Sequence, residues 1–236
     1  MAEYTILPCV PEDVMELAIL ERAAFDGEPL THLMFGSPSP SALSWRADRF
    51  SESIADPGCR WVKIVQDGKI VGAALWGHRT STDWMDKLTG AEKETEYKEE
   101  DDKLAQGNKQ ARHDFLTWLY GVRKRRMGGK PHILLYLLIV HPDYQRRGIG
   151  GAFIRDGVQQ AEKLGVPAWL EASTAGFSVY KAHGFEVVEE FSLRLADYGG
   201  REEDGEAPSW GMLKPAPATV EGQVEGEAVP GTGTKN

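Results

Sequence analysis

The chain has 236 residues, of which 41% are hydrophobic, and a formal net charge of −9 at pH 7. This length suits one decorated domain, and the apolar content is enough for a sizeable core. The acidic balance argues against a nucleic-acid binder, whose affinity comes from a basic face. No apolar run approaches the ~18 residues that a membrane helix needs, so we expect neither nucleic acid nor membrane as a partner.

The start of the sequence and the cysteines bear on the compartment. The first four residues, Met-Ala-Glu-Tyr, lack the basic and apolar regions of a signal peptide. Cys9 and Cys59 are too few and too isolated to form a disulfide framework or a metal site. We therefore expect a cytoplasmic protein with two reduced thiols and no metal, and leave a nuclear location open.

The first third of the chain predicts a strand, two helices and a hairpin. Residues 4–7 alternate like a strand, and residues 11–25 carry apolar side chains at helical spacing after an acidic first turn. Residues 25–35 are unusually apolar for a loop, and residues 41–54 fit a second helix. Asp67-Gly68 between two apolar runs is a strong hairpin signal.

A charged insertion is predicted at about residues 77–130. Residues 91–110 are rich in Glu, Lys and Gln, which favours a solvated helix, whereas the aromatic residues of 113–120 should dock on the body. Residues 123–126 then form a basic cluster, Arg-Lys-Arg-Arg. A solvated surface is its simplest interpretation, and a coenzyme-phosphate contact or a nuclear-targeting string stays open.

The stretch after the apolar segment 133–140 is the most informative of the sequence. It reads Gln145-Arg146-Arg147-Gly148-Ile149-Gly150-Gly151 and leads into a helical pattern to residue 164. Glycines let backbone N–H groups approach one centre, and a helix N-terminus adds unpaired N–H groups and a positive dipole end. Two arginines add full charges there. This pattern predicts a site for an anionic phosphate group.

Two other phosphate loops are excluded by the residues themselves. No Gly-x-x-x-x-Gly-Lys-Ser/Thr string occurs in the chain. The dinucleotide fingerprint needs a third glycine where this sequence has Phe153.

The remaining pattern, Gln-x-x-Gly-x-Gly after a Val-His-Pro strand end, resembles the acetyl-CoA loop of the GNAT acetyltransferases. A second signature follows a short strand at 168–171, where a predicted helix at 175–183 carries Tyr180 four residues before Gly184-Phe185. The order of elements also fits, with later strands at 187–195 and 209–213. The chain resembles in particular small GNAT proteins of the fungal type.

This resemblance implies an α/β GNAT fold over residues 1–214, with a mixed central sheet of about six to seven strands and flanking helices. The pyrophosphate loop would lie between the fourth strand and the third core helix. Residues 215–236, rich in Pro, Gly and Glu without periodicity, predict a disordered tail.

The resemblance also implies acetyl-CoA as co-substrate and a set of residues that bind it. Backbone groups along one strand would bind the pantetheine arm, and the glycine loop would bind the pyrophosphate. Ser173 stands where many relatives have an asparagine that reaches the coenzyme, and Gly176 stands where alanine is common. The complete expected set is Leu138, Ile139, Val140, Gln145, Arg146, Arg147, Gly148, Ile149, Gly150, Gly151, Ser173 and Tyr180.

Two residues are expected to act in catalysis. Tyr180 occupies the position where relatives keep the acid for the leaving thiolate, and a phenol with a pKa near 10 stays protonated at neutral pH. Glu171, near the end of its strand, is the candidate base, acting directly or through water. A surface carboxylate is an equal alternative, and His78, His141 and His183 are rivals because imidazole titrates near neutrality.

Together these features predict an N-acetyltransferase for a primary amine. The acidic chain favours a small cationic acceptor, and residues 25–35 should form one wall of its site. Protein or peptide N-acetylation and a non-catalytic acyl-CoA-binding module are the alternatives. The protein would be a monomer or a homodimer.

Overall fold

The computed structural model describes residues 4–36, 39–80 and 107–217. Most of the helix predicted at 91–110 and of the tail predicted at 215–236 lies outside these residues. Within these ranges seven strands form one mixed sheet in the order β1-β2-β3-β4-β5-β7-β6. Their bounds are Leu7–Pro8, Cys59–Gln66, Lys69–Arg79, His132–Val140, Ala168–Ala172, Glu186–Arg194 and Glu206–Lys214 for β1 to β7.

Six α-helices and four short 3-10 helices connect the described strands. The α-helices α1 to α6 span Val14–Phe25, Pro29–Phe35, Pro40–Ala55, Lys109–Met127, Ile149–Leu164 and Thr174–Ala182. The 3-10 helices are η1 (Pro11–Asp13), η5 (Pro142–Tyr144), η6 (Leu195–Tyr198) and η7 (Glu202–Asp204). None of the helices in the described ranges is long and apolar enough to span a membrane.

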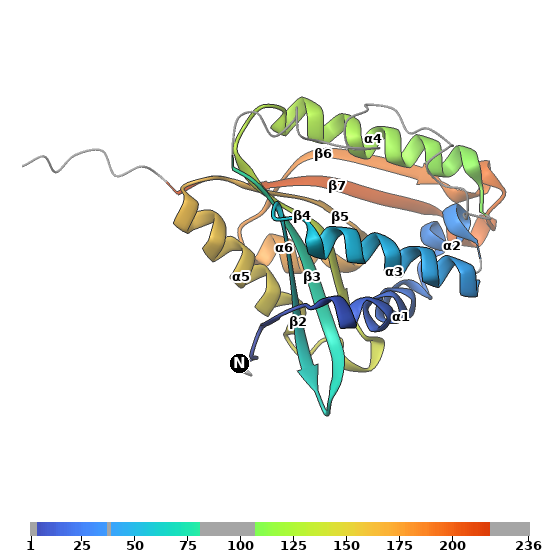
Figure 1. Cartoon of the computed structure of the whole chain (residues 1–236). Helices are drawn as coiled ribbons and strands as arrows, with labels where there is room; N and C mark the ends of the chain where they lie inside the picture. The colour runs from blue at the N-terminus through green and yellow to red at the C-terminus, as the bar shows by residue number, and fades with distance from the viewer. Residues whose placement is uncertain (1–3, 37–38, 81–106, 218–236) are drawn as a thin grey trace, which may run out of the picture.

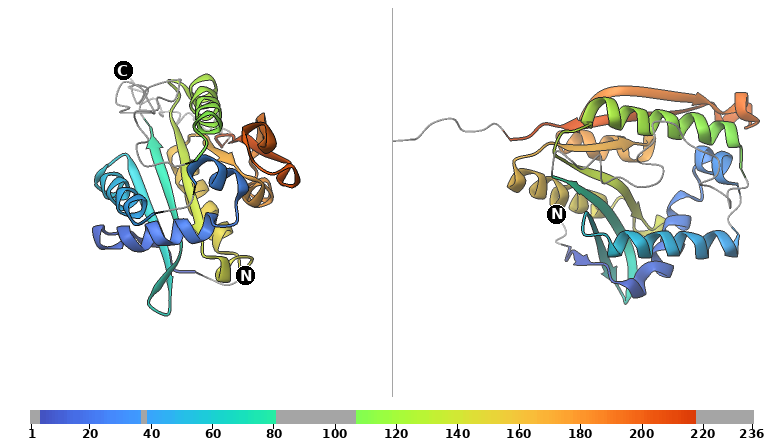
Figure 2. Two further views of the ribbon diagram at one scale, coloured as in Figure 1. Left: turned by 90° about the vertical axis from the view of Figure 1, so that its right-hand side faces the viewer. Right: turned by 45° about the horizontal axis from the view of Figure 1, so that its top comes forward.

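The helices cover both faces of the sheet (Figures 1 and 2). Helices α1 and α3 pack on β2, β3 and β4, whereas α5 and α6 pack on the opposite face. Helix α4 runs along β6 and β7, as Figure 1 shows, and buries Val122 and Met127 against Leu134 and Trp169 of the sheet. This arrangement confirms the α/β fold with a mixed sheet and flanking helices.

The hairpin prediction is confirmed, and the turn explains why these residues form it. β2 and β3 pair antiparallel, and both Asp67 (φ 51°) and Gly68 (φ 74°) have left-handed backbone conformations. Two consecutive left-handed residues match the twist of the flanking strands, and Asp-Gly tolerates them.

Two predictions about the N-terminal region need correction. The first strand is only Leu7–Pro8 instead of residues 4–7, because its pairing is limited to two positions of β2. The segment 25–35 is not a loop, since its second half forms α2. Pro29 occupies the first turn of this helix, where its missing N–H costs nothing and its fixed φ favours the helix.

Helix α4 extends the predicted docking segment at both ends. Asn108 caps it, its side-chain oxygen accepting from the Ala111 N–H at 2.9 Å. The Asn108 backbone N–H donates to the Leu33 carbonyl of α2, and its side-chain amide donates to the Tyr198 carbonyl of η6. Trp118 of α4 stacks on Phe191 of β6 with ring centroids 4.9 Å apart. The expectation that aromatic residues of 113–120 dock on the body is therefore confirmed.

The pairing of β4 with its neighbours determines where a ligand can enter the sheet. β4 pairs with β5 only from Ile133–Ala168 to Leu135–Leu170. On its other side the register with β3 shifts between Leu75 and Trp76, which leaves Tyr136 as the extra residue of a bulge. Such a bulge bends the strand. Beyond Leu135 the β5 side of β4 has no strand partner among the described residues.

Candidate active site

The glycine loop lies where the sequence predicts it, between β4 and α5. Val140 ends the strand, η5 follows, and α5 begins at Ile149 with Gly148 as its N-cap. Arg146 (φ 61°) and Gly148 (φ 90°) both have left-handed conformations, so the chain turns sharply on either side of Arg147. Successive N–H groups in such a turn form a concave donor surface for anions.

The backbone N–H groups of this loop have no acceptor in the part of the chain that the structure describes. None of the N–H groups of residues 146–151 donates to another group of the described chain. A Cβ at Gly148 would have no atom within 4 Å, and one at Gly150 would meet only Leu138 at 3.6 Å. The loop therefore presents free N–H groups to open space at the positive end of a helix of 16 residues.

Side chains hold this loop against the end of β4. The Gln145 side-chain amide donates to the Val140 carbonyl at 3.2 Å. The Arg147 guanidinium lies over the Tyr144 ring, 5.0 Å from its centroid. Arg146 and Arg147 are exposed, so both charges are available to an anion beside the loop.

The second part of the site is the separation of β4 from β5. Beyond Leu135, the β5 side of β4 passes Leu138, Ile139 and Val140 without a strand partner among the described residues. Amide groups of an extended ligand can pair with such an edge as an added strand does. The glycine loop lies at the end of the same strand, so one elongated ligand can reach both.

Tyr180 comes from α6 and lies in the core on the α5 side of the sheet. It is 7% exposed, and its ring packs edge-on against Phe185 with centroids 6.3 Å apart. Burial raises the pKa of Tyr180 to about 12. Its hydroxyl has no hydrogen-bond partner among the described residues. Tyr180 therefore stays protonated across the neutral range and has a hydrogen bond to donate.

Gly176 makes room for the ring of Tyr180. A Cβ at residue 176 would lie 2.5 Å from Cε2 and 2.8 Å from the hydroxyl oxygen of Tyr180. An alanine there would displace the ring, which gives a physical reason for glycine at this position. Ser173 is the N-cap residue of α6 but is exposed, and its hydroxyl makes no capping bond, so it remains able to contact a ligand.

Glu171 lies one residue beyond the last β4–β5 pair, and both oxygens of its carboxylate accept hydrogen bonds. Oε1 accepts from Arg123 Nε at 2.9 Å and from Trp169 Nε1 at 2.5 Å, while Oε2 accepts from Arg123 Nη2 at 2.7 Å. The two side chains of this ion pair are only 14% and 6% exposed. Burial alone would lower the pKa of Arg123, but the charge and hydrogen bonds of Glu171 outweigh it and raise that pKa.

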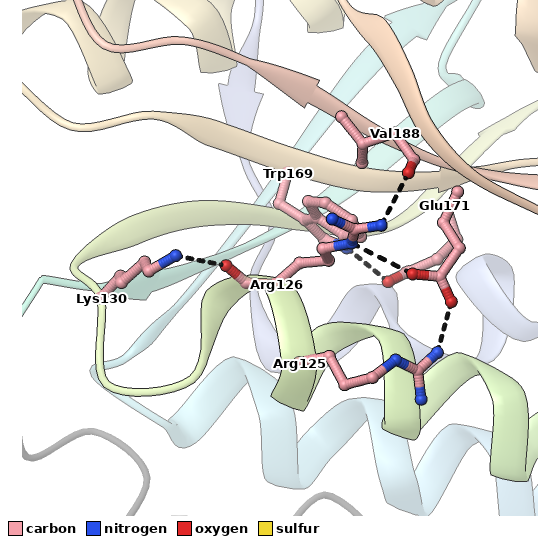
Figure 3. A network of polar contacts seen from close by, with 7 residues as sticks. Arg125, Arg126, Lys130, Trp169, Glu171 and Val188 are labelled. Atoms are coloured by element: carbon pink, nitrogen blue, oxygen red, sulfur yellow. Dashed lines mark hydrogen bonds and ion pairs between the residues drawn. The ribbon is translucent and has the colours of Figure 1, made fainter.

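The basic cluster 123–126 is solvated, as predicted, at Lys124, Arg125 and Arg126, but Arg123 turns inward. The Arg123 side chain is largely buried in its pair with Glu171, and Arg125 and Arg126 both pair with Glu189 of β6. Figure 3 shows Arg125 and Arg126 at the C-terminal end of α4, where Arg126 donates to the Val188 carbonyl. Arg123 also lies over the Tyr136 ring of β4, 5.2 Å from its centroid. The contacts of the three arginines are therefore with Glu171, Glu189 and the sheet.

The acetyltransferase (GNAT) family model matches residues 26–185, which is more than half of the chain. This chain belongs to the GNAT family. It is therefore an acyltransferase that uses acetyl-CoA as its co-substrate. Among the described residues there is no group of three or more His, Cys, Asp or Glu side chains that could hold a metal ion.

Solved GNAT structures share the fold of this chain at low sequence identity. A Drosophila melanogaster polyamine N-acetyltransferase that forms N-acetylagmatine is 17% identical, with a TM-score of 0.58 over 90% of this chain and 100% of that one. A mosquito arylalkylamine N-acetyltransferase (like 5b) is 16% identical, with a TM-score of 0.58 and the same coverage. A phosphinothricin acetyltransferase from Sinorhizobium meliloti, in complex with acetyl-CoA, is 15% identical (TM-score 0.56, 91% and 89%).

The three histidines considered as rival bases of this GNAT protein differ in position and in hydrogen bonding. His78 faces Ile133 across β3 and β4, about 17 Å along the strand from Leu138. Burial, followed by the charges of Arg60 and Arg79, lowers its pKa. His141 accepts from the Asp143 N–H through Nδ1. His183 donates through Nδ1 to the Val179 carbonyl, 2.7 Å away.

The sequence alone does not show that Arg123 pairs with Glu171 in this GNAT protein. Its position in an Arg-Lys-Arg-Arg run indicated a solvated cation, and the run itself does not show which arginine turns inward. The helical spacing held a signal, because Arg123 lies one position after the buried Val122 and four before the buried Met127. That spacing places Arg123 on the face of α4 that packs on the sheet.

Proposed function

We propose that this GNAT protein transfers the acetyl group of acetyl-CoA to the primary amine of a small cationic molecule. The observation that supports this most is the arrangement around β4. Among the described residues, the N–H groups of 146–151 are unpaired and lie at the end of a strand whose β5 side has no partner beyond Leu135. One molecule with a pyrophosphate, an extended amide-bearing arm and a terminal thioester matches both features.

In this proposal the pyrophosphate binds the N–H groups of the loop, with Arg146 and Arg147 neutralising its charge. The pantetheine amides pair with the backbone of Leu138, Ile139 and Val140, and the Ser173 hydroxyl supplies a further contact. A backbone N–H of β4 polarises the thioester carbonyl as an oxyanion hole does. The rate enhancement then comes chiefly from holding the thioester beside the amine.

Tyr180 is the proposed donor to the leaving sulfur. Because burial raises its pKa to about 12, full transfer of its proton to a thiolate would run uphill, since thiols titrate near 8.5. A hydrogen bond from the phenol instead stabilises negative charge as it develops on sulfur. Such a bond contributes most in a site from which water is excluded.

The contacts of Glu171 weigh against its proposed role as a free base. Its two oxygens already accept from Arg123 and Trp169, so accepting the amine proton would require opening a buried ion pair. We propose that Glu171 is a positioning residue that fixes the end of β5. The amine would then lose its proton to water, and its own pKa would set the low-pH side of the rate profile.

A cationic acceptor is supported by charge and by the relatives. The net charge of −9 attracts cations at long range. One structure with the same fold belongs to a polyamine N-acetyltransferase and another to an arylalkylamine N-acetyltransferase. Helix α2, held by α4 and η6, would form one wall of the acceptor site.

The test is thiol release from acetyl-CoA over a panel of acceptors. The panel contains diamines and polyamines, a guanidino-amine, an arylalkylamine, neutral amino acids and peptides with free N-termini or lysines. We expect the highest kcat/KM with a small dication. A preference for peptides would instead assign protein or peptide N-acetylation. Tight acetyl-CoA binding without turnover on any acceptor would assign a non-catalytic binding module.

A further inference from the structure

The N-terminal segment contacts the glycine loop from 143 residues away in the sequence. The phenol of Tyr4 donates a hydrogen bond to the carbonyl oxygen of Arg147 at 2.7 Å. Its ring packs against the core cluster on the α5 side of the sheet. The ring packing and the hydrogen bond together fix the position of the Tyr4 hydroxyl. No motif of the sequence indicated this contact.

The carbonyl that Tyr4 binds belongs to the same peptide unit as the N–H of Gly148. No peptide bond of the described residues is cis, and in a trans peptide the C=O and N–H bonds point in opposite directions. Fixing the Arg147 carbonyl toward Tyr4 therefore fixes the Gly148 N–H on the side away from Tyr4. That N–H is one of the loop donors without an acceptor in the described chain.

The Arg147–Gly148 peptide plane rotates about ψ of Arg147 and φ of Gly148, and Gly148 has a φ of 90°. Glycine is free to reach other conformations, so rotation of this plane would turn the donor away. The Tyr4 hydroxyl opposes that rotation.

We propose that Tyr4 is a positioning residue for coenzyme binding, which holds the Arg147–Gly148 peptide with its N–H directed at the pyrophosphate. This inference rests on the proposed binding of acetyl-CoA at the loop. Tyr4 itself does not touch the coenzyme in this account. It acts by pre-organising one donor, and so it lowers the entropy lost on binding.

The test compares Tyr4→Phe with Tyr144→Phe in calorimetric titrations of acetyl-CoA. Each substitution removes one phenol oxygen beside the loop and keeps the ring, but no hydrogen bond of the Tyr144 hydroxyl is found among the described residues. Since a hydrogen bond contributes ~0.5–1.5 kcal/mol, Tyr4→Phe should raise the Kd for acetyl-CoA by roughly 3- to 10-fold. Tyr144→Phe should leave it unchanged.

A second ligand separates loop positioning from a general structural role. S-acetyl-pantetheine lacks the pyrophosphate, so its affinity, titrated by NMR, should be the same in wild type and Tyr4→Phe. Equal weakening of both ligands would overturn the inference, and so would an unchanged acetyl-CoA affinity in Tyr4→Phe while wild type binds. Failure of wild type to bind acetyl-CoA would instead overturn the proposed coenzyme site and this inference with it.

Discussion

Replacing Glu171 by glutamine tests whether its carboxylate supports the fold or accepts the amine proton. The substitution keeps an oxygen acceptor for Trp169 Nε1 but removes the negative charge opposite Arg123. A guanidinium that is 14% exposed is then left without its counterion. Breaking a buried pair in this way typically costs ~3–5 kcal/mol. Since 1 kcal/mol shifts the melting temperature of a domain this size by ~2–4 °C, we expect Tm to fall by roughly 10 °C.

A double-mutant cycle tests whether this fall in Tm comes from loss of the Arg123–Glu171 ion pair. Arg123→Met alone leaves a buried carboxylate without its partner and should be similarly destabilising. Combining Arg123→Met with Glu171→Gln removes both charges and should recover at least half of the loss. Thermal unfolding of the four proteins, followed by circular dichroism, gives the coupling free energy.

Kinetics at a temperature well below every Tm then separates the two roles of Glu171. If it is a positioning residue, both single variants should lose activity together. If it is the base, Arg123→Met should retain turnover, and the pKa of the freed Glu171 carboxylate should set the low-pH limb of its rate profile. Glu171→Gln should then lose turnover. A Glu171→Gln protein with the wild-type Tm would refute the argument from the buried pair.

Two further predictions concern Tyr180 and His132. Tyr180→Phe should lower kcat by about 10²-fold. Because burial raises the pKa of Tyr180 to about 12, any high-pH limb of the kcat profile below about pH 11 should persist in this variant. Loss of a limb near pH 9 would contradict this. His132 is 1% exposed, and burial lowers its pKa to about 4. The unfolded state therefore binds a proton at higher pH than the folded state does. The free energy of unfolding should fall by roughly 3 kcal/mol as pH drops from about 6.5 to 4. Urea unfolding of wild type and His132→Gln should differ in this pH dependence, and equal slopes would contradict it.

The parts of the fold that the sequence predicts well are those specified locally. Asp67-Gly68 determines a hairpin within four residues, and the loop glycines determine a turn before a helix. Tyr180 and the left-handed Gly184 (φ 83°) are placed by the period and the end of a single helix. In each case the physical cause lies within a few residues of the feature it produces.

The remaining features depend on contacts between distant residues. Arg123 and Glu171 are 48 residues apart, and Tyr4 and Arg147 are 143 apart. No residue near either partner indicates the other, so the sequence predicts a solvated Arg123 and makes Glu171 a candidate base. The separation of β4 from β5 likewise follows from the bulge at Tyr136, which no sequence period indicates.

The central claim is that the glycine loop binds the pyrophosphate of acetyl-CoA, and Gly150→Val tests it most directly. Residue 150 lies in the first turn of α5, and a Cβ there would meet only Leu138 at 3.6 Å, so the fold should tolerate the side chain. The added methyl groups would occupy the space in front of the unpaired N–H groups. Calorimetry should therefore show at least ~100-fold weaker acetyl-CoA binding, as expected when several charge-assisted hydrogen bonds are lost, with a nearly unchanged Tm. Wild-type affinity in Gly150→Val would contradict the claim.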